Sequence, residues 1–144
     1  MDELPIRAEE EQAEAFQLYR LAAEQGIAGA QCRLGVMYAE GRGVARDEKE
    51  SVRWFRLAAE QGDAEAQGGL GLACGTGRGV SQDFVASHVW MTLAAAGLTG
   101  ETRKGALRFR AMIAATMTSE QIAEAGRRAH EWLPTTLKRS EDTA

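Results

Sequence analysis

The apolar positions of this chain recur at the spacing of a helix. Ala30, Leu34, Met37 and Tyr38 follow the i, i+4, i+7, i+8 pattern of one face of an amphipathic helix. Gly41 comes next, as the residue that ends such a helix in a left-handed conformation. No segment shows the sustained alternation or the hairpin signal of a β-strand. The pattern therefore predicts an all-α protein.

Start and stop signals divide the chain into seven predicted helices. Asp47 and Asp83 are placed as N-cap residues, with Glu50 as a capping-box partner of Asp47. Thr118 and Gln121 form the same capping-box signal near the C-terminus. The predicted helices cover residues 8–25, 28–40, 47–61, 64–76, 83–96, 100–116 and 119–133.

The chain repeats itself with a period of 36 residues. Residues 19–54 match residues 55–90 at nineteen of 36 positions, and LAAEQG occurs in both copies. A fixed period of this length is typical of stacked helix pairs, each of which buries its apolar face against the next. We predict a single solenoid over 8–134, with full repeats at about 19–54 and 55–90, a divergent third unit and cap at 91–134, an N-terminal segment at 1–7 and a flexible tail at 135–144.

The recurring residues resemble the Sel-one-like repeat family, which is related to the tetratricopeptide repeat. In the first copy the matching residues are Ala22, Ala23, Gly26, Ala28, Ala30, Gln31, Leu34, Gly35, Tyr38, Gly41, Gly43, Val44, Asp47 and Trp54. All but Tyr38 return 36 residues later, and the stretch 117–132 is similar to the terminal helix of bacterial members. The resemblance implies a right-handed superhelix of antiparallel helix pairs with a C-terminal capping helix, and a role as a protein-interaction scaffold.

The leading functional prediction is a non-enzymatic adaptor that binds a peptide or partner protein on its concave face, with no cofactor. One alternative is a β-lactam-hydrolysing or cell-wall-binding repeat enzyme, since some secreted members bind or cleave β-lactams. Those members resemble a disulfide-stapled repeat, whereas this chain has only Cys32 and Cys74, at different repeat positions. The other alternative is an inhibitor or immunity protein for a toxin partner.

Analogy with the tetratricopeptide register places the first helix of each pair on the concave face. Its non-consensus positions are predicted to contact the partner: Gly29, Cys32, Arg33, Val36, Ala39, Glu40, Glu65, Gly68, Gly69, Leu72, Gly75 and Thr76. These positions are unusually small in the second copy. Either the groove is merely narrow there and the glycines have no function, or the backbone of an approaching partner needs the room.

Other candidate chemistry is sparse. GTGRG at 75–79 looks like a nucleotide-binding loop, but it follows a predicted helix instead of a strand. Asp83, Ser87 and His88 are within reach of one another on one predicted helix, but a catalytic triad usually draws on separate elements. His88 and His130 have no cysteine or carboxylate at metal-ligand spacing. We predict no catalytic, cofactor or metal site.

Charge and hydropathy narrow the range of partners. The formal net charge is −4, and no concentrated basic surface of the kind that nucleic-acid binding needs is predicted. No apolar run approaches the length of a membrane span, and the acidic start MDELPIRAEEEQ lacks the apolar core of a signal peptide. We therefore expect no membrane partner and a cytoplasmic location, or a periplasmic one if a signal peptide has been removed.

The predicted helix at 8–25 corresponds to the second helix of a repeat. Its apolar residues Phe16 and Tyr19, or else Leu18 and Leu21, are therefore expected to lack one helical neighbour. The ends of repeat stacks normally need a polar cap. We predict either self-association through this helix or its burial by residues 1–7.

Overall fold

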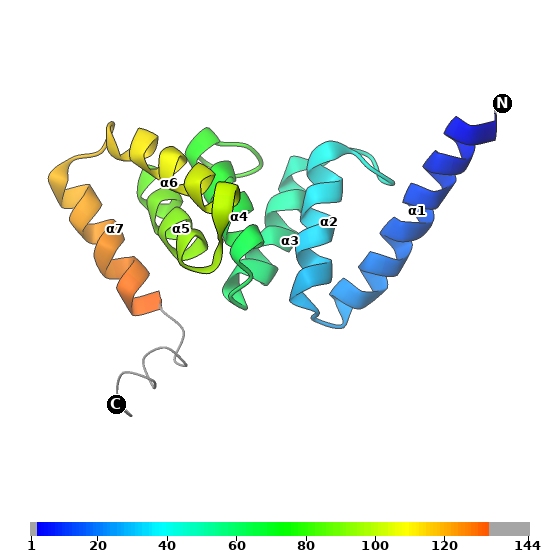
Figure 1. Ribbon diagram of the computed structural model, residues 1–144, viewed down its shortest axis with the longest axis horizontal. Coiled ribbons are helices and arrows are strands. Elements are labelled where there is room, and N and C mark those ends of the chain that lie inside the picture. The colour runs from blue at the N-terminus through cyan, green and yellow to red at the C-terminus, as the bar shows by residue number, and fades with distance from the viewer. Residues whose placement is uncertain (1–2, 133–144) are drawn as a thin grey trace.

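In the described part of the chain, seven helices follow one another as an elongated stack, with α1 at one end and α7 at the other (Figure 1). The computed structural model describes residues 3–132. Within that range there is no strand, so the predicted all-α solenoid is confirmed. The helices are α1 (Glu3–Glu24), α2 (Ala28–Glu40), α3 (Glu48–Glu60), α4 (Ala64–Thr76), α5 (Phe84–Gly97), α6 (Gly100–Ala114) and α7 (Ser119–Trp132).

Asp47 caps the N-terminus of α3, as predicted. Its carboxylate accepts hydrogen bonds from the backbone N–H groups of Lys49 and Glu50, both at 3.1 Å. The predicted reciprocal bond from Glu50 is wrong, because the N–H of Asp47 already donates to the carbonyl of Tyr38 at 3.0 Å. The Glu50 carboxylate instead forms an ion pair with Arg53.

The other predicted caps are confirmed. Asp83 accepts a hydrogen bond from the N–H of Ala86 at 3.0 Å and so begins α5. Thr118 and Gln121 exchange two backbone-to-side-chain hydrogen bonds, of 2.9 and 3.1 Å, before α7. Each cap satisfies backbone donors that the first turn of a helix leaves unpaired.

An aromatic ring between two glycines connects the two repeats. Phe55 of α3 is 8% exposed, and its ring lies against Gly35 of α2 and Gly69 of α4. A Cβ atom at Gly35 would stand 2.6 Å from the ring, and one at Gly69 would stand 2.9 Å from it. Protein interiors are close-packed, so neither position has room for a side chain while the ring stays in place. Phe55 therefore lets α2 and α4 lie close together on one side of α3.

A buried hydrogen bond recurs in both helix pairs. The Ser51 hydroxyl donates to the carbonyl of Gly35 at 2.6 Å, and the Ser87 hydroxyl donates to that of Gly71 at 2.7 Å. Both serines are buried. A buried hydroxyl without a partner is costly, so these bonds satisfy the serines while tying the second helix of each pair to the first.

The C-terminal helices cover the end of the second repeat. The Trp132 ring of α7 meets Trp90 of α5 edge to face, with ring centroids 5.1 Å apart. Trp54 and Trp90 are 6% and 8% exposed, so both are buried between packed helices. The helix α6 packs on α5 through Met91 and Ala106.

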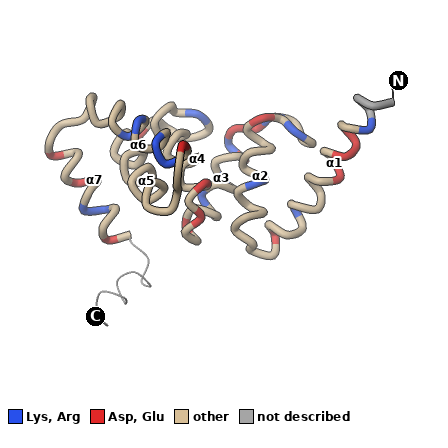
Figure 2. The backbone as a smooth tube through the Cα atoms, in the orientation of Figure 1, with Lys and Arg blue, Asp and Glu red and all other residues tan. Residues whose placement is uncertain are grey.

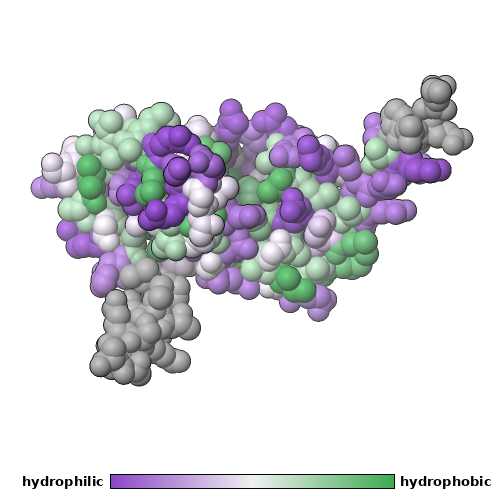
Figure 3. All heavy atoms as spheres, in the orientation of Figure 1, coloured by the Kyte–Doolittle hydropathy of each residue, from purple (hydrophilic) through white to green (hydrophobic). Residues whose placement is uncertain are grey.

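The outer face of α1 has no helix packed on it within the described chain. Leu18 is 68% exposed, whereas Trp54, its counterpart in the next repeat, is 6% exposed. Apolar atoms are visible along this end of the molecule in Figure 3. Residues 3–7 continue α1 instead of folding back over it, so the predicted burial of this face by residues 1–7 is wrong as far as the structure describes that segment.

Gly35→Ala tests the packing of Phe55, and Gly29→Ala is a matched control in the same helix. We expect Gly35→Ala to lower the free energy of unfolding by about 1–3 kcal/mol, because the ring that the new methyl would displace is blocked on its other side by Gly69. A Cβ atom at Gly29 meets open space, so Gly29→Ala should raise the free energy of unfolding by up to about 1 kcal/mol. Urea denaturation measures both; equal effects would contradict the packing described.

We propose that the chain self-associates through the outer face of α1, where Leu18 and Leu21 are 68% and 61% exposed. Leu18→Arg combined with Leu21→Arg should then leave a monomer, because a guanidinium loses its hydration in an apolar contact. Each monomer should stay folded, since both side chains lie in solvent in the single chain. Light scattering over a range of concentrations is the test, and a wild-type chain that stays monomeric throughout would contradict the proposal.

Candidate partner-binding groove

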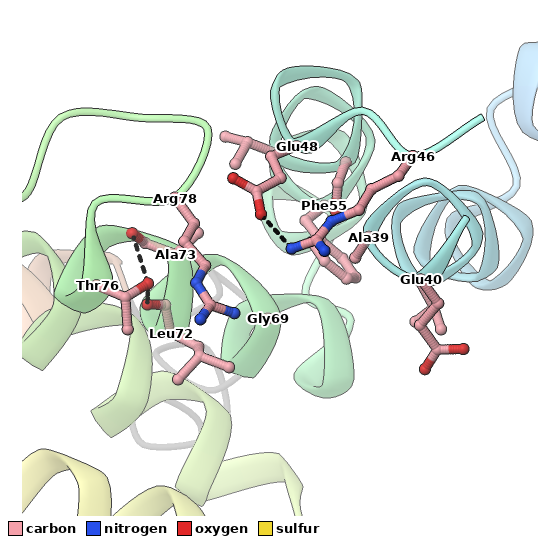
Figure 4. Close-up of a pocket in the computed structure, with 13 residues that line it drawn as sticks. Ala39, Glu40, Arg46, Glu48, Phe55, Gly69, Leu72, Ala73, Thr76 and Arg78 are labelled. Atoms are coloured by element: carbon pink, nitrogen blue, oxygen red, sulfur yellow. Dashed lines mark hydrogen bonds and ion pairs between the residues drawn. The ribbon is translucent and has the colours of Figure 1, made fainter. Parts of the chain in front are cut away.

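A groove of about 250 Å³ lies on the surface between α2 and α4 (Figure 4). We call it the central groove. Its apolar lining includes Val36 and Ala39 of α2, Phe55 of α3, and Gly69 and Leu72 of α4. Leu72 is 48% exposed although it is large and apolar. The second helix of the first repeat thus supplies the floor, and the first helices of two successive repeats supply the walls.

A second hollow lies between α1 and α2 and has a volume of about 220 Å³. We call it the N-terminal hollow. Tyr19 of α1 and Arg33 of α2 line it. Val36 and Glu40 line both this hollow and the central groove, so the two depressions adjoin across α2.

Seven of the twelve predicted partner-facing residues line these depressions. Val36, Ala39, Glu40, Gly69, Leu72 and Thr76 line the central groove, and Arg33 joins Val36 and Glu40 in the N-terminal hollow. Gly29 and Glu65 are exposed at the starts of their helices, and Gly68 is half-buried. The sequence therefore identified much of the groove's lining, and a role of these residues in binding stays a prediction.

Cys32 and Gly75 are buried, so the expectation that they face a partner is wrong. Cys32 is 5% exposed and belongs to the core cluster that also contains Phe55 and Leu70. A Cβ atom at Gly75 would stand 2.8 Å from the Phe109 ring of α6. The analogy treated one side of each first helix as open, but the neighbouring helices cover part of that side.

The glycines of α4 accommodate the protein's own side chains. Gly69 lies against Phe55, and Gly75 lies against Phe109 and Ser87. A Cβ atom at Gly68 would make only an ordinary contact with Ala94, at 3.9 Å. Two of the three small positions thus have a packing role within the fold, which neither of the two sequence-based explanations anticipated.

The rim of the groove carries charge. Arg46 forms an ion pair with Glu48 at 2.6 Å, and Arg42 forms one with Glu40 at 3.0 Å. Arg78 also lines the groove and has no ion-pair partner among residues 3–132. A groove of this kind can contact apolar side chains on its floor and polar groups along its edge.

Sequence reasoning missed Phe55 and Arg78 as groove residues. Phe55 lies on the second helix of its pair, whereas the tetratricopeptide register places the first helix on the concave face. Arg78 is the equivalent of Arg42, which lies in the turn after the first helix of the preceding repeat. The repeat itself therefore accounts for an arginine at this position. The signal that could have identified Arg78 is the replacement of Glu40, the acidic partner of Arg42, by Thr76 at the equivalent position.

The residues considered for catalysis make separate contacts. The Ser87 hydroxyl donates to the carbonyl of Gly71, and Asp83 caps α5. Burial, and then the nearby Arg110, lower the pKa of His88. No hydrogen bond connects these three side chains within the described chain, so they do not form a triad there.

Clusters of metal ligands and membrane-spanning helices are both absent from the described residues. No group of three or more His, Cys, Asp or Glu side chains in that part of the chain is arranged to hold a metal ion. None of the described helices is both long and apolar enough to cross a bilayer.

The stacked helix pairs and the groove between their first helices define a helical-repeat protein of the solenoid class. The Sel1 repeat profile matches residues 8–27, 28–63 and 64–97, which is more than half of the chain. The chain therefore belongs to the Sel1 repeat family, which confirms the resemblance seen in the sequence. Members of this family are generally protein-interaction scaffolds, and typically non-enzymatic.

Two solved structures are similar to this chain. One is a protective antigen present in uropathogenic Escherichia coli strains that displays an SLR fold, with 31% identity and a TM-score of 0.80 over 87% of this chain and 26% of that one. The other is a Sel1 repeat protein from Oxalobacter formigenes, with 35% identity and a TM-score of 0.58 over 59% of this chain and 25% of that one. The chain thus spans about a quarter of the length of each. No curated protein matches it.

The burial of both cysteines leads to a prediction about their reactivity. Burial raises the pKa of the Cys32 thiol to about 12, with a further contribution from Asp63, and burial also raises the pKa of Cys74. Thiolate is the reactive form. We expect neither thiol to react with Ellman's reagent in the folded protein at mildly alkaline pH, and both to react in denaturant. Fast reaction of either thiol in the folded chain would contradict the described packing.

The same shift predicts how stability depends on pH. The folded-state pKa of Cys32 lies above its ordinary value of 9.0, so the unfolded chain loses the proton first. The contribution of Cys32 to stability is therefore complete below about pH 9 and is lost as the pH rises from there toward about 12. Urea denaturation at several alkaline pH values measures this loss, and Cys32→Ala should make it shallower.

Proposed function

We propose that this chain is a non-enzymatic scaffold that binds an extended segment of a partner protein in the central groove. The observation that carries the proposal is the exposed apolar lining, where Leu72 stands 48% exposed beside Val36 and Phe55. Apolar side chains gathered in an exposed depression with a charged rim are typical of a protein-interaction site. The general scaffold role of Sel1 repeat proteins supports the same function.

The shape of the groove favours a peptide over a small molecule. Pockets that enclose small molecules usually have volumes of about 300–1,000 Å³ and bury most of the ligand. The central groove has a volume of about 250 Å³ and adjoins the N-terminal hollow across α2. An extended chain can place successive side chains in the two depressions, with Val36 and Glu40 between them. We assign this strip to the concave face of the solenoid.

The enzyme alternative has less support than the inhibitor or immunity alternative. The enzyme alternative rested on a resemblance to disulfide-stapled members, and Cys32 and Cys74 are both free and buried. No observation on this chain favours that alternative. An inhibitor or immunity protein would use the same groove as an adaptor and would differ only in the identity of its partner.

Leu72→Arg tests the function, and Leu57→Arg is its matched control. Both leucines are exposed, at 48% and 38%, but Leu57 lies on α3 outside the central groove. We expect a library of random displayed peptides to yield binders of the wild-type chain. Leu72→Arg should weaken their binding at least roughly tenfold, because a guanidinium would replace the apolar contact. Leu57→Arg should leave it unchanged.

Isothermal titration with the synthetic peptides measures the dissociation constants, and the melting temperatures of all three proteins show that each is folded. Cys32→Arg is unsuitable as a groove variant, because Cys32 is 5% exposed and an arginine there would unfold the core. If no displayed peptide binds, or if Leu57→Arg weakens binding as much as Leu72→Arg, the central groove is not the binding site.

A further inference from the structure

Within the described part of the chain, an arginine that occurs in both repeats forms an ion pair within the first repeat but has no carboxylate to pair with in the second. In the first repeat, the guanidinium of Arg42 lies 3.0 Å from the carboxylate of Glu40. The equivalent arginine of the second repeat is Arg78, and Thr76 stands where Glu40 stood. The Thr76 hydroxyl donates to the carbonyl of Leu72 at 2.8 Å. Arg78 is therefore left without a carboxylate among the described residues.

Arg78 stands at the edge of the apolar floor of the central groove. Figure 4 shows its side chain extending toward Gly69 and Leu72, with the guanidinium at the open side of the groove. Arg46 also lines the groove, but Glu48 occupies its guanidinium at 2.6 Å. Among the residues that the structure describes, the groove thus presents one unpaired guanidinium next to an exposed leucine.

The lining of the central groove is balanced in charge, with Arg46 and Arg78 against Glu40 and Glu48, and the adjoining N-terminal hollow adds an excess of positive charge. The formal net charge of the chain is −4, and acidic side chains predominate along α1 in Figure 2. The central groove and the N-terminal hollow together have more arginines than acidic residues in their lining, namely Arg33, Arg42, Arg46 and Arg78 against Glu40 and Glu48. This excess of positive charge favours an acidic segment of a partner over a basic one.

We propose that Arg78 binds a carboxylate of the partner segment, so that the groove selects an acidic residue next to an apolar one. This inference rests on the proposed function of the groove. The partner's carboxylate takes the position that the Glu40 carboxylate occupies beside Arg42, and the apolar side chain covers Leu72. A guanidinium matches a carboxylate with two parallel N–H donors, which makes the contact directional.

A carboxylate can come from an Asp or Glu side chain or from the C-terminus of a chain. The probes are the synthetic peptides obtained by display on the wild-type protein. Each is made with its acidic residues intact or changed to Asn and Gln, and with a free or an amidated C-terminus. A loss of binding on the change of side chains identifies a side-chain source, and a loss on amidation identifies a C-terminal source.

Arg78→Ala is the first variant. We expect removal of the peptide's carboxylate to weaken binding to the wild-type protein roughly tenfold, as for a hydrogen bond to a charged group. Arg78→Ala should weaken binding of the intact peptide by a similar factor and should abolish its sensitivity to removal of the carboxylate. Arg56→Ala is the control, because Arg56 is an exposed arginine of α3 that does not line the groove.

Thr76→Glu is the second variant, and it restores the internal partner present in the first repeat. Its carboxylate should pair with Arg78 as Glu40 pairs with Arg42, and so compete with the peptide. We expect weaker binding of the peptide that carries the carboxylate and little change for the peptide from which the carboxylate has been removed. The melting temperature of the protein should be unchanged. Gln17→Glu adds the same charge on an exposed position of α1 outside the groove, and should have little effect on either peptide.

Each result separates this inference from the proposed function. Peptides that require Leu72 but are insensitive to Arg78→Ala would overturn the carboxylate contact and leave the scaffold function in place. Equal effects of Thr76→Glu and Gln17→Glu on peptide binding would also overturn the contact. They would show that the added negative charge repels the peptide at long range, without competition for Arg78. If no peptide requires Leu72, the proposed function fails and this inference fails with it.

Discussion

The ring of Phe55, held between Gly35 and Gly69, is the contact on which the arrangement of the two repeats depends. Successive units of a solenoid meet mainly through their nearest helices, so one well-packed contact can set the position of a whole unit. Here the absence of a Cβ atom on α2 and on α4 lets both helices approach the same ring. A larger residue at either glycine would push one of the first helices away from α3.

The central groove is a consequence of that contact. Because Phe55 fills the space at Gly69 from within, this small position of α4 is packed against the protein's own core. The outer side of the ring then forms a floor, and Val36 and Leu72 rise on the two sides of it. The apolar surface offered to a partner and the packing that connects the repeats therefore share one residue.

The consensus and non-consensus positions of the repeat have separate physical roles. Ser51 and Ser87 bond the carbonyls of Gly35 and Gly71, and the side chains of Gln31 and Gln67 bond those of Ala23 and Ala59, so these consensus residues satisfy buried polar groups in each unit. Part of the groove's chemistry comes from positions that differ between the copies, such as Glu40 and Thr76. Replacement of Glu40 by Thr76 leaves the stacking intact and changes only which groups remain unpaired at the surface. A repeat protein can thus vary its binding surface without altering its core.

The sequence by itself determined the seven helices, the Asp47 and Asp83 caps and the 36-residue unit, because these depend on contacts between residues close together in the chain. It also identified much of the groove's lining, since that follows from the repeat register. Only the tertiary structure decided which of those positions stay open. Cys32 is covered in the core and Gly75 by Phe109, a residue of the divergent third unit that the repeat pattern does not describe. For the same reason, the sequence did not predict Phe55 as the groove floor. The Phe55 ring contacts two helices from different repeats. The period of a sequence shows which residues are equivalent along the chain, but not which side chains meet in the folded structure.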